Sequence, residues 1–173
     1  MKNINTILAV LLVILSATSY AQNNRTTISY KDFDPSIPVK GDLFLKNDDL
    51  DKFVGSYVWE ENGVKMVINF NKVEETGPYD EGTMTIQVLK GAPILFNNGK
   101  KIARDLCLVG SMDISNSNIV TCQYMVNFHS SVFIEIVYID SNTLVLRKGA
   151  RSADFSDKEK NWLPYNSTFK KQI

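Results

Sequence analysis

The sequence predicts an all-β protein built as an up-and-down antiparallel β-barrel. After residue 55, apolar side chains alternate with polar ones in segment after segment, which is the pattern of half-buried strands. Two Asn-Gly pairs, at 62–63 and 98–99, have the chemistry of tight hairpin turns. The eight or nine short strands that result follow one another in sequence. Closing such a long meander removes its edge strands, so we predict a barrel in preference to a sandwich.

The first hairpin is defined both by its turn and by its pattern. A two-residue loop at Asn62 and Gly63 places Trp59 opposite Met66 and Tyr57 opposite Ile68. All four side chains then share one face of the sheet, so the turn and the alternation agree on the register.

The remaining elements follow from local signals. We expect a loop over 74–82, because Gly77-Pro78 is a typical break. Strands are expected over 84–88, 93–96, 100–109, 119–128, 132–139, 143–148 and 165–170. In the hairpin over 132–148, a two-residue loop pairs Ile139 with Leu144. Short helical turns are expected at 47–53, with Asn47 as the N-cap, and at 156–162, before the last strand.

The N-terminus has the order of a secretory signal peptide. Lys2 precedes an unbroken apolar run over 7–15, and small residues occupy Ser19 and Ala21. The run is about half the roughly 20 residues that a membrane-spanning helix needs. We therefore predict a signal peptide over 1–21, an irregular lead-in over 22–42 and one barrel domain over 43–173. The protein is expected to be periplasmic or extracellular, with no membrane span in its mature form.

Charge excludes some partners. The chain has 19 basic and 19 acidic residues, and removal of Lys2 with the signal peptide leaves a net charge of −1. Nucleic-acid binding requires a basic face, so no nucleic-acid partner is expected.

The segment over 50–57, with Gly55 and with Tyr57 in the place of a Trp, resembles the start of a lipocalin barrel. The whole chain is similar to a family of small exported bacterial proteins of unknown function that is lipocalin-like. Its hairpin motif matches Leu89, Gly91, Asn98 and Gly99, and its late strand matches Thr143, Leu144 and Leu146. Its ending matches Leu163, Pro164, Asn166, Phe169 and Lys170. This resemblance implies a calycin-type barrel and brings no activity with it.

The two cysteines of the exported part permit a disulfide. A symmetric hairpin centred between residues 114 and 115 places Cys107 opposite Cys122 and Val109 opposite Val120. Directly opposed residues lie within disulfide reach. Two buried thiols are the alternative, because free cysteines are common core residues.

The sequence holds few groups for catalysis or metal binding. His129 is its only histidine, and no nucleophile-elbow motif surrounds Ser130 or Ser131. The acidic groups at 48–51 and 74–81 match no calcium-binding loop. We therefore expect no enzyme activity, no metal and no cofactor.

The alternating apolar residues have two interpretations: they either fill the barrel or line a cavity for a small apolar ligand. The candidate ligand-binding residues in the barrel interior are Tyr57, Trp59, Met66, Ile68, Phe70, Ile86 and Val88. The sequence thus favours an exported binder of a small apolar molecule. A filled barrel that serves as an envelope or protein-interaction module is the alternative.

Overall fold

The computed structural model describes residues 25–38, 40–102, 107–113, 115–127, 130–148 and 164–172. The predicted signal peptide, the helical turn over 156–162 and His129 lie outside these residues. Of the predicted lead-in over 22–42, the structure describes 25–38 and 40–42.

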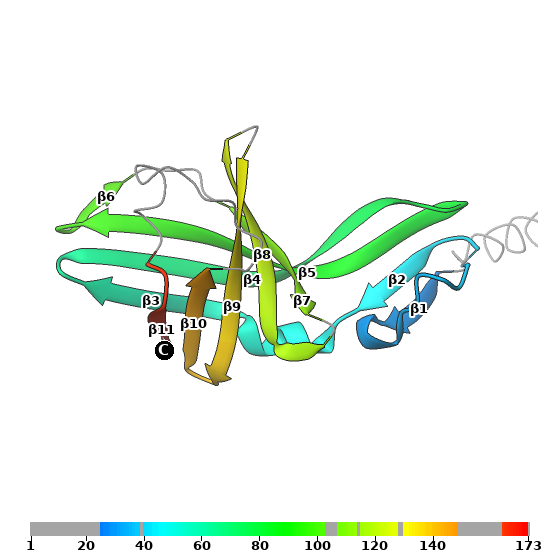
Figure 1. Ribbon diagram of the computed structural model, residues 1–173, viewed down its shortest axis with the longest axis horizontal. Helices are drawn as coiled ribbons and strands as arrows, with labels where there is room; N and C mark the ends of the chain where they lie inside the picture. The colour runs from blue at the N-terminus through cyan, green and yellow to red at the C-terminus, as the bar shows by residue number, and fades with distance from the viewer. Residues whose placement is uncertain are drawn as a thin grey trace, which may run out of the picture.

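Eight antiparallel strands form a closed ring, which confirms the predicted up-and-down barrel (Figure 1). In ring order they are β3 (Gly55–Glu61), β4 (Val64–Tyr79), β5 (Gly82–Asn97), β7 (Leu108–Asp113), β8 (Asn116–Asn127), β9 (Ser130–Asp140), β10 (Thr143–Lys148) and β11 (Ser167–Lys171). The ring closes where β11 pairs with β3, at Lys170↔Val58 and Lys171↔Tyr57.

Both Asn-Gly turns have the predicted conformation. Asn62 and Gly63 have φ values of 51° and 78°, and Asn98 and Gly99 have values of 47° and 76°. Positive φ at both central positions defines a type I′ turn. The first turn sets the register that the sequence predicted, Trp59↔Met66 and Tyr57↔Ile68. The second joins β5 to the short β6 (Lys100–Ile102).

The β4–β5 hairpin is much longer than predicted and continues beyond the barrel. The expected loop over 74–82 is wrong, because β4 runs through Gly77 and Pro78 to Tyr79. Beyond Phe70, β4 pairs only with β5 among the described residues, so this part of β4 is an edge strand. Proline is tolerated there because its missing N–H breaks no second ladder. Figure 1 shows this outer half of the hairpin turning away from the barrel.

Two N-terminal strands flank the outer half of the hairpin. β2 (Leu43–Lys46) pairs in parallel with β5, and β1 (Thr26–Ser29) pairs in parallel with β2. The 3-10 turn η1 (Tyr30–Asp32) follows β1. The prediction of an irregular segment is therefore wrong for the strand Thr26–Ser29.

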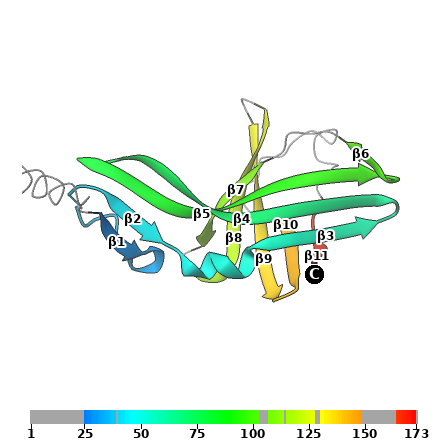
Figure 2. The same ribbon diagram turned by 180° about the vertical axis from the view of Figure 1, so that it is seen from behind.

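A second 3-10 turn, η2 (Asp48–Phe53), leads from β2 into the barrel (Figure 2). Leu50 and Phe53 from η2 are fully buried and join the main core. Asn47 occupies the predicted N-cap position, but its side chain makes no capping hydrogen bond. No helix among the described residues has the length and hydrophobicity to cross a membrane.

Candidate functional site

Large side chains fill the interior of the barrel. Four of the predicted ligand-binding residues, Tyr57, Met66, Ile68 and Phe70, are at most 2% exposed and lie in one core cluster. Trp59 is partly buried and packs against that cluster. The other walls contribute Leu89, Leu95, Leu108, Met112, Val120, Cys122, Ile134, Ile136, Leu144, Leu146 and Phe169.

Gly91 shows how tightly this interior is packed. It lies opposite Phe70 in the β4–β5 ladder. A Cβ atom at Gly91 would lie 2.4 Å from Cε1 of Phe70 and 3.2 Å from Cγ2 of Ile68. The interior at this level has no room for one additional methyl group, and still less for a ligand.

Ile86 and Val88 do not belong to the interior, so their predicted place is wrong. The interior residues Phe70, Ile68 and Met66 of β4 pair with Gly91, Pro93 and Leu95 of β5. Because side chains alternate along a strand, Ile86 and Val88 point to the opposite, outer face. Val88 is nevertheless only 4% exposed. The apolar alternation at 84–88 therefore reflects burial outside the barrel interior.

A groove of about 580 Å³ lies on this outer face. The outer half of the β4–β5 hairpin supplies one wall, through Ile86 and Val88. Strands β7, β8 and β9 supply the rest of the lining, with Val109, Gly110, Ser111, Met112, Asp113, Thr121, Gln123, Phe133 and Glu135; of these, Met112 also belongs to the core cluster of the interior.

The strand register arranges much of this lining in two rows across β7, β8 and β9. One row is polar and consists of Ser111, Thr121 and Glu135, because Thr121 pairs with both of the others. The next row consists of Val109, Gln123 and Phe133, joined through Gln123. Apolar surface therefore lies directly beside hydroxyl and carboxylate groups. A molecule with both kinds of surface is what such a groove can hold.

The groove has an acidic character among the residues described. Asp113 and Glu135 line it, and the lining contains no Lys, Arg or His in that part of the chain. Oδ1 of Asp113 accepts hydrogen bonds from the backbone N–H of Ser115 at 2.8 Å and from its hydroxyl at 2.6 Å. These bonds lower the pKa of the Asp113 carboxyl group, so it is ionised at neutral pH.

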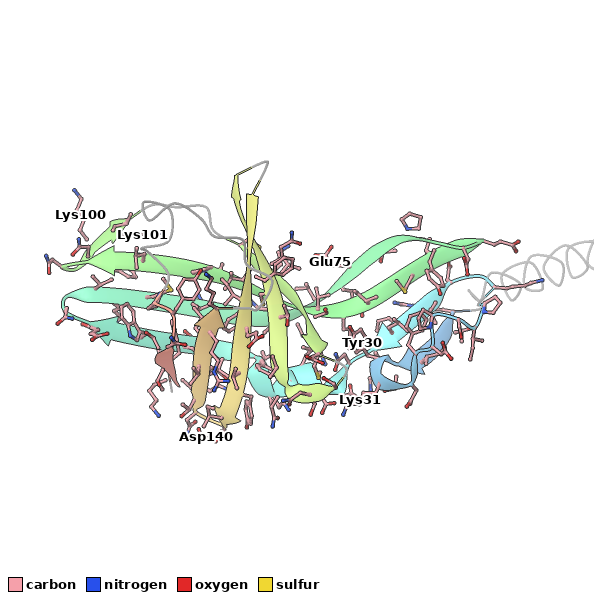
Figure 3. The ribbon with its side chains drawn as sticks, in the orientation of Figure 1. Tyr30, Lys31, Glu75, Lys100, Lys101 and Asp140 are labelled. Carbon is pink, nitrogen blue, oxygen red and sulfur yellow. The ribbon has the colours of Figure 1, made fainter. Side chains whose placement is uncertain are left out.

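The acidic residues of η2 are paired with lysines. Asp48 binds Lys46 at 2.8 Å, Asp49 binds Lys31, and Asp51 binds Lys72. Figure 3 shows Lys31 beside this turn and Glu75 near the bend of the β4–β5 hairpin. No group of three potential metal ligands gathers among the described residues.

The predicted register, with Cys107 opposite Cys122 and Val109 opposite Val120, is wrong. In the structure Gly110, not Cys107, lies opposite Cys122, and both thiols are free. Asp113↔Asn116 at the hairpin tip keeps the symmetric register, but a bulge between Met112 and Asp113 shifts the ladder below it. Cys107 is exposed, whereas Cys122 is fully buried in the core, and this burial raises the pKa of its thiol.

Asn47 is the one buried polar side chain with an atom left unpaired within the described part of the chain. Its backbone N–H donates to Gln87 Oε1 at 2.8 Å, but its side-chain Nδ2 has no hydrogen-bond partner. A second cavity, of about 230 Å³, lies between this residue, β1 and η1. Its lining includes Tyr30 and Lys31, which Figure 3 shows together.

Sequence reasoning missed most of the groove, but the sequence contains a signal for it. In β9, Phe133, Ile134, Ile136 and Val137 are apolar on both faces of the strand. Apolar residues on both faces are typical of a strand that is covered on both sides. That break in the alternation, together with the apolar run at 84–88, marks the two walls of the groove.

Comparison with known families identifies the relatives of the chain. Residues 1–106 match the family described as "Family of unknown function (DUF6705)". The chain belongs to this family. Within DUF6705, the matched region extends through β6, so it includes Ile86 and Val88 but not the groove residues of β7, β8 and β9. No curated protein and no solved structure matches this DUF6705 chain.

Proposed function

We propose that this protein is an exported, non-catalytic carrier that binds a small, largely apolar molecule in the groove outside its barrel. The observation that carries the proposal is the contrast between the two faces of the same strands. At Gly91 the interior has no room for even one added methyl group, whereas the outer face has a groove of about 580 Å³. This volume falls within the range of about 300–1,000 Å³ that is typical of small-molecule sites.

Binding would be driven by burial of apolar ligand surface against the groove. The apolar contacts come from Ile86, Val88, Val109 and Phe133. Each Å² of apolar surface removed from water contributes about 25 cal/mol. The polar row of Ser111, Thr121 and Glu135 would orient the ligand by hydrogen bonds. Export rests on the signal-peptide pattern over 1–21, and the absence of catalysis rests on the single histidine and the lack of a nucleophile motif.

The experiment is native mass spectrometry of the protein isolated from its own compartment without detergent or denaturant. We expect a reproducible added mass that organic extraction removes. Thr121→Trp should abolish this added mass, because the indole would occupy the groove. Thr168→Trp is the matched control, since Thr168 is an exposed threonine on β11, outside the groove lining. An added mass that persists in Thr121→Trp would place the ligand elsewhere.

A filled barrel that acts through a protein partner is the second candidate. Among the described residues, the edge of β4 beyond Phe70 has no second partner strand. This favours the second candidate, because an extended peptide can add to such an edge by main-chain hydrogen bonds. A clean mass without ligand, together with cross-linking of a partner to residues 71–79, would support this function over the carrier.

A further inference from the structure

We propose that the groove selects a ligand that carries a positive charge next to its apolar part, as in an alkylammonium amphiphile, with the cation bound at Glu135. The inference rests on the proposed function and adds the chemical class of the ligand. The strongest support is the charge of the groove, which has two carboxylates and no basic residue within the described lining.

Glu135 is the group best placed to bind a cation. Its side chain is half-buried on β9, and it forms no ion pair with any described residue. A bound cation would form with this carboxylate the ion pair that no described residue supplies. Thr121 lies directly opposite on β8 and offers a hydroxyl group beside the carboxylate.

Two basic residues border the groove without neutralising it. Lys90 lies opposite Val109, but its ammonium group is 3.9 Å from the carboxylate of Glu75 on the neighbouring strand. Arg147 lies opposite Glu135 on β10, is exposed, and makes no ion pair with Glu135 within the described part of the chain. Arg147 therefore competes with a bound cation only weakly, and its removal should strengthen cation binding.

The apolar part of the ligand fits the row beside Glu135. Phe133 is two residues away on the same face of β9, and Val109 continues that row on β7, two strands away. Val88 forms the buried wall across from them. An alkyl chain that extends from a cation at Glu135 would contact the apolar ring of Phe133 and then, beyond Gln123, the side chain of Val109. Asp113, on β7, adds a second negative charge to the same groove.

The test compares three probes of equal chain length, octylammonium, octanol and octanoate, by isothermal titration calorimetry at low salt. We expect octylammonium to bind at least about sixfold more tightly than octanol, the factor that one ion pair at 4 Å gives even in bulk water. Octanoate should bind most weakly. Glu135→Gln should remove the preference for octylammonium and leave octanol binding unchanged.

Two variants make the result specific. Glu60→Gln removes the same charge from an exposed position on β3 and should leave the preference intact. Arg147→Gln should raise the affinity for octylammonium. If octanol and octylammonium bind equally and Thr121→Trp abolishes both, the groove is a ligand site but the inferred charge selection is wrong. If none of the three probes binds, both the inference and the proposed function are overturned.

Discussion

Replacement of Gly91 by alanine is the most direct test of the filled interior. A Cβ at this position would lie 2.4 Å and 2.7 Å from two ring carbons of Phe70, distances that carbon atoms in proteins do not adopt. The ring must therefore move by about 1 Å into a core whose members are almost fully buried. Overpacking of this kind typically costs about 1–3 kcal/mol.

A compensating gain must be set against that cost. Alanine lowers the entropy of the unfolded chain and stabilises a protein by about 0.4–1 kcal/mol where it fits. Gly77→Ala provides a measurement of this gain in the same chain, because a Cβ at residue 77 would have no neighbour within 4 Å. We therefore expect Gly77→Ala to raise the free energy of unfolding slightly and Gly91→Ala to lower it by about 1–2 kcal/mol.

The assay is equilibrium urea unfolding followed by fluorescence, with Phe70→Leu and the double variant completing a mutant cycle. Phe70→Leu removes the ring that the new methyl group meets, so the two changes should couple favourably by about 1 kcal/mol. If Gly91→Ala is as stable as Gly77→Ala, the barrel has interior space. A ligand could then bind inside the barrel, and the outer groove would no longer be the favoured site.

Two further predictions concern buried polar groups. In the unfolded chain the Cys122 thiol ionises above its ordinary pKa of 9.0, whereas burial raises the pKa of the thiol in the folded protein. The free energy of unfolding should therefore be constant below pH 9 and fall by about 1.4 kcal/mol by pH 10. Urea unfolding from pH 8 to 10 should show this loss in Cys107→Ala but not in Cys122→Ala. Asn47→Leu should not lower the free energy of unfolding by the roughly 1 kcal/mol expected for loss of an N-cap. The Asn47 side chain makes no capping bond and its Nδ2 is unpaired, so the substitution removes no hydrogen bond from that amide nitrogen. A thermal melt that shows such a loss would contradict this expectation.

Short-range signals in the sequence were sufficient for the turns and for the class of fold. An Asn-Gly pair determines a type I′ turn by the conformational freedom of its two residues, and the turn then sets the register of the strands on either side. This is why Trp59 and Met66 face each other as predicted. Closure of the ring also followed from the sequence, because a long meander without closure would expose its edges.

The predicted register was wrong wherever a β-bulge followed the turn. At the β9–β10 turn Thr143↔Asp140 keeps the expected pairing, but the next pair is Leu144↔Tyr138 and not Leu144↔Ile139. Ile139 is the extra residue, and it is 52% exposed. The same effect in the β7–β8 hairpin places Gly110, in place of Cys107, opposite Cys122. A bulge depends on the twist that neighbouring strands require, and this information is not local to the hairpin.

The groove could not be predicted from the sequence for a more general reason. Alternation identifies the residues of a strand that share a face, but it does not say whether that face points into the barrel. Ile86 and Val88 alternate as regularly as Met66 and Ile68, yet the two pairs lie on opposite sides of the sheet. The pairing of β7 with β5 accounts for this difference. Because β7 joins β5 at Leu89, the outer half of the β4–β5 hairpin lies beyond the barrel and forms one wall of the groove. The position of a ligand site in this protein thus depends on where one long strand exchanges its neighbours, and only the three-dimensional pairing reveals that point.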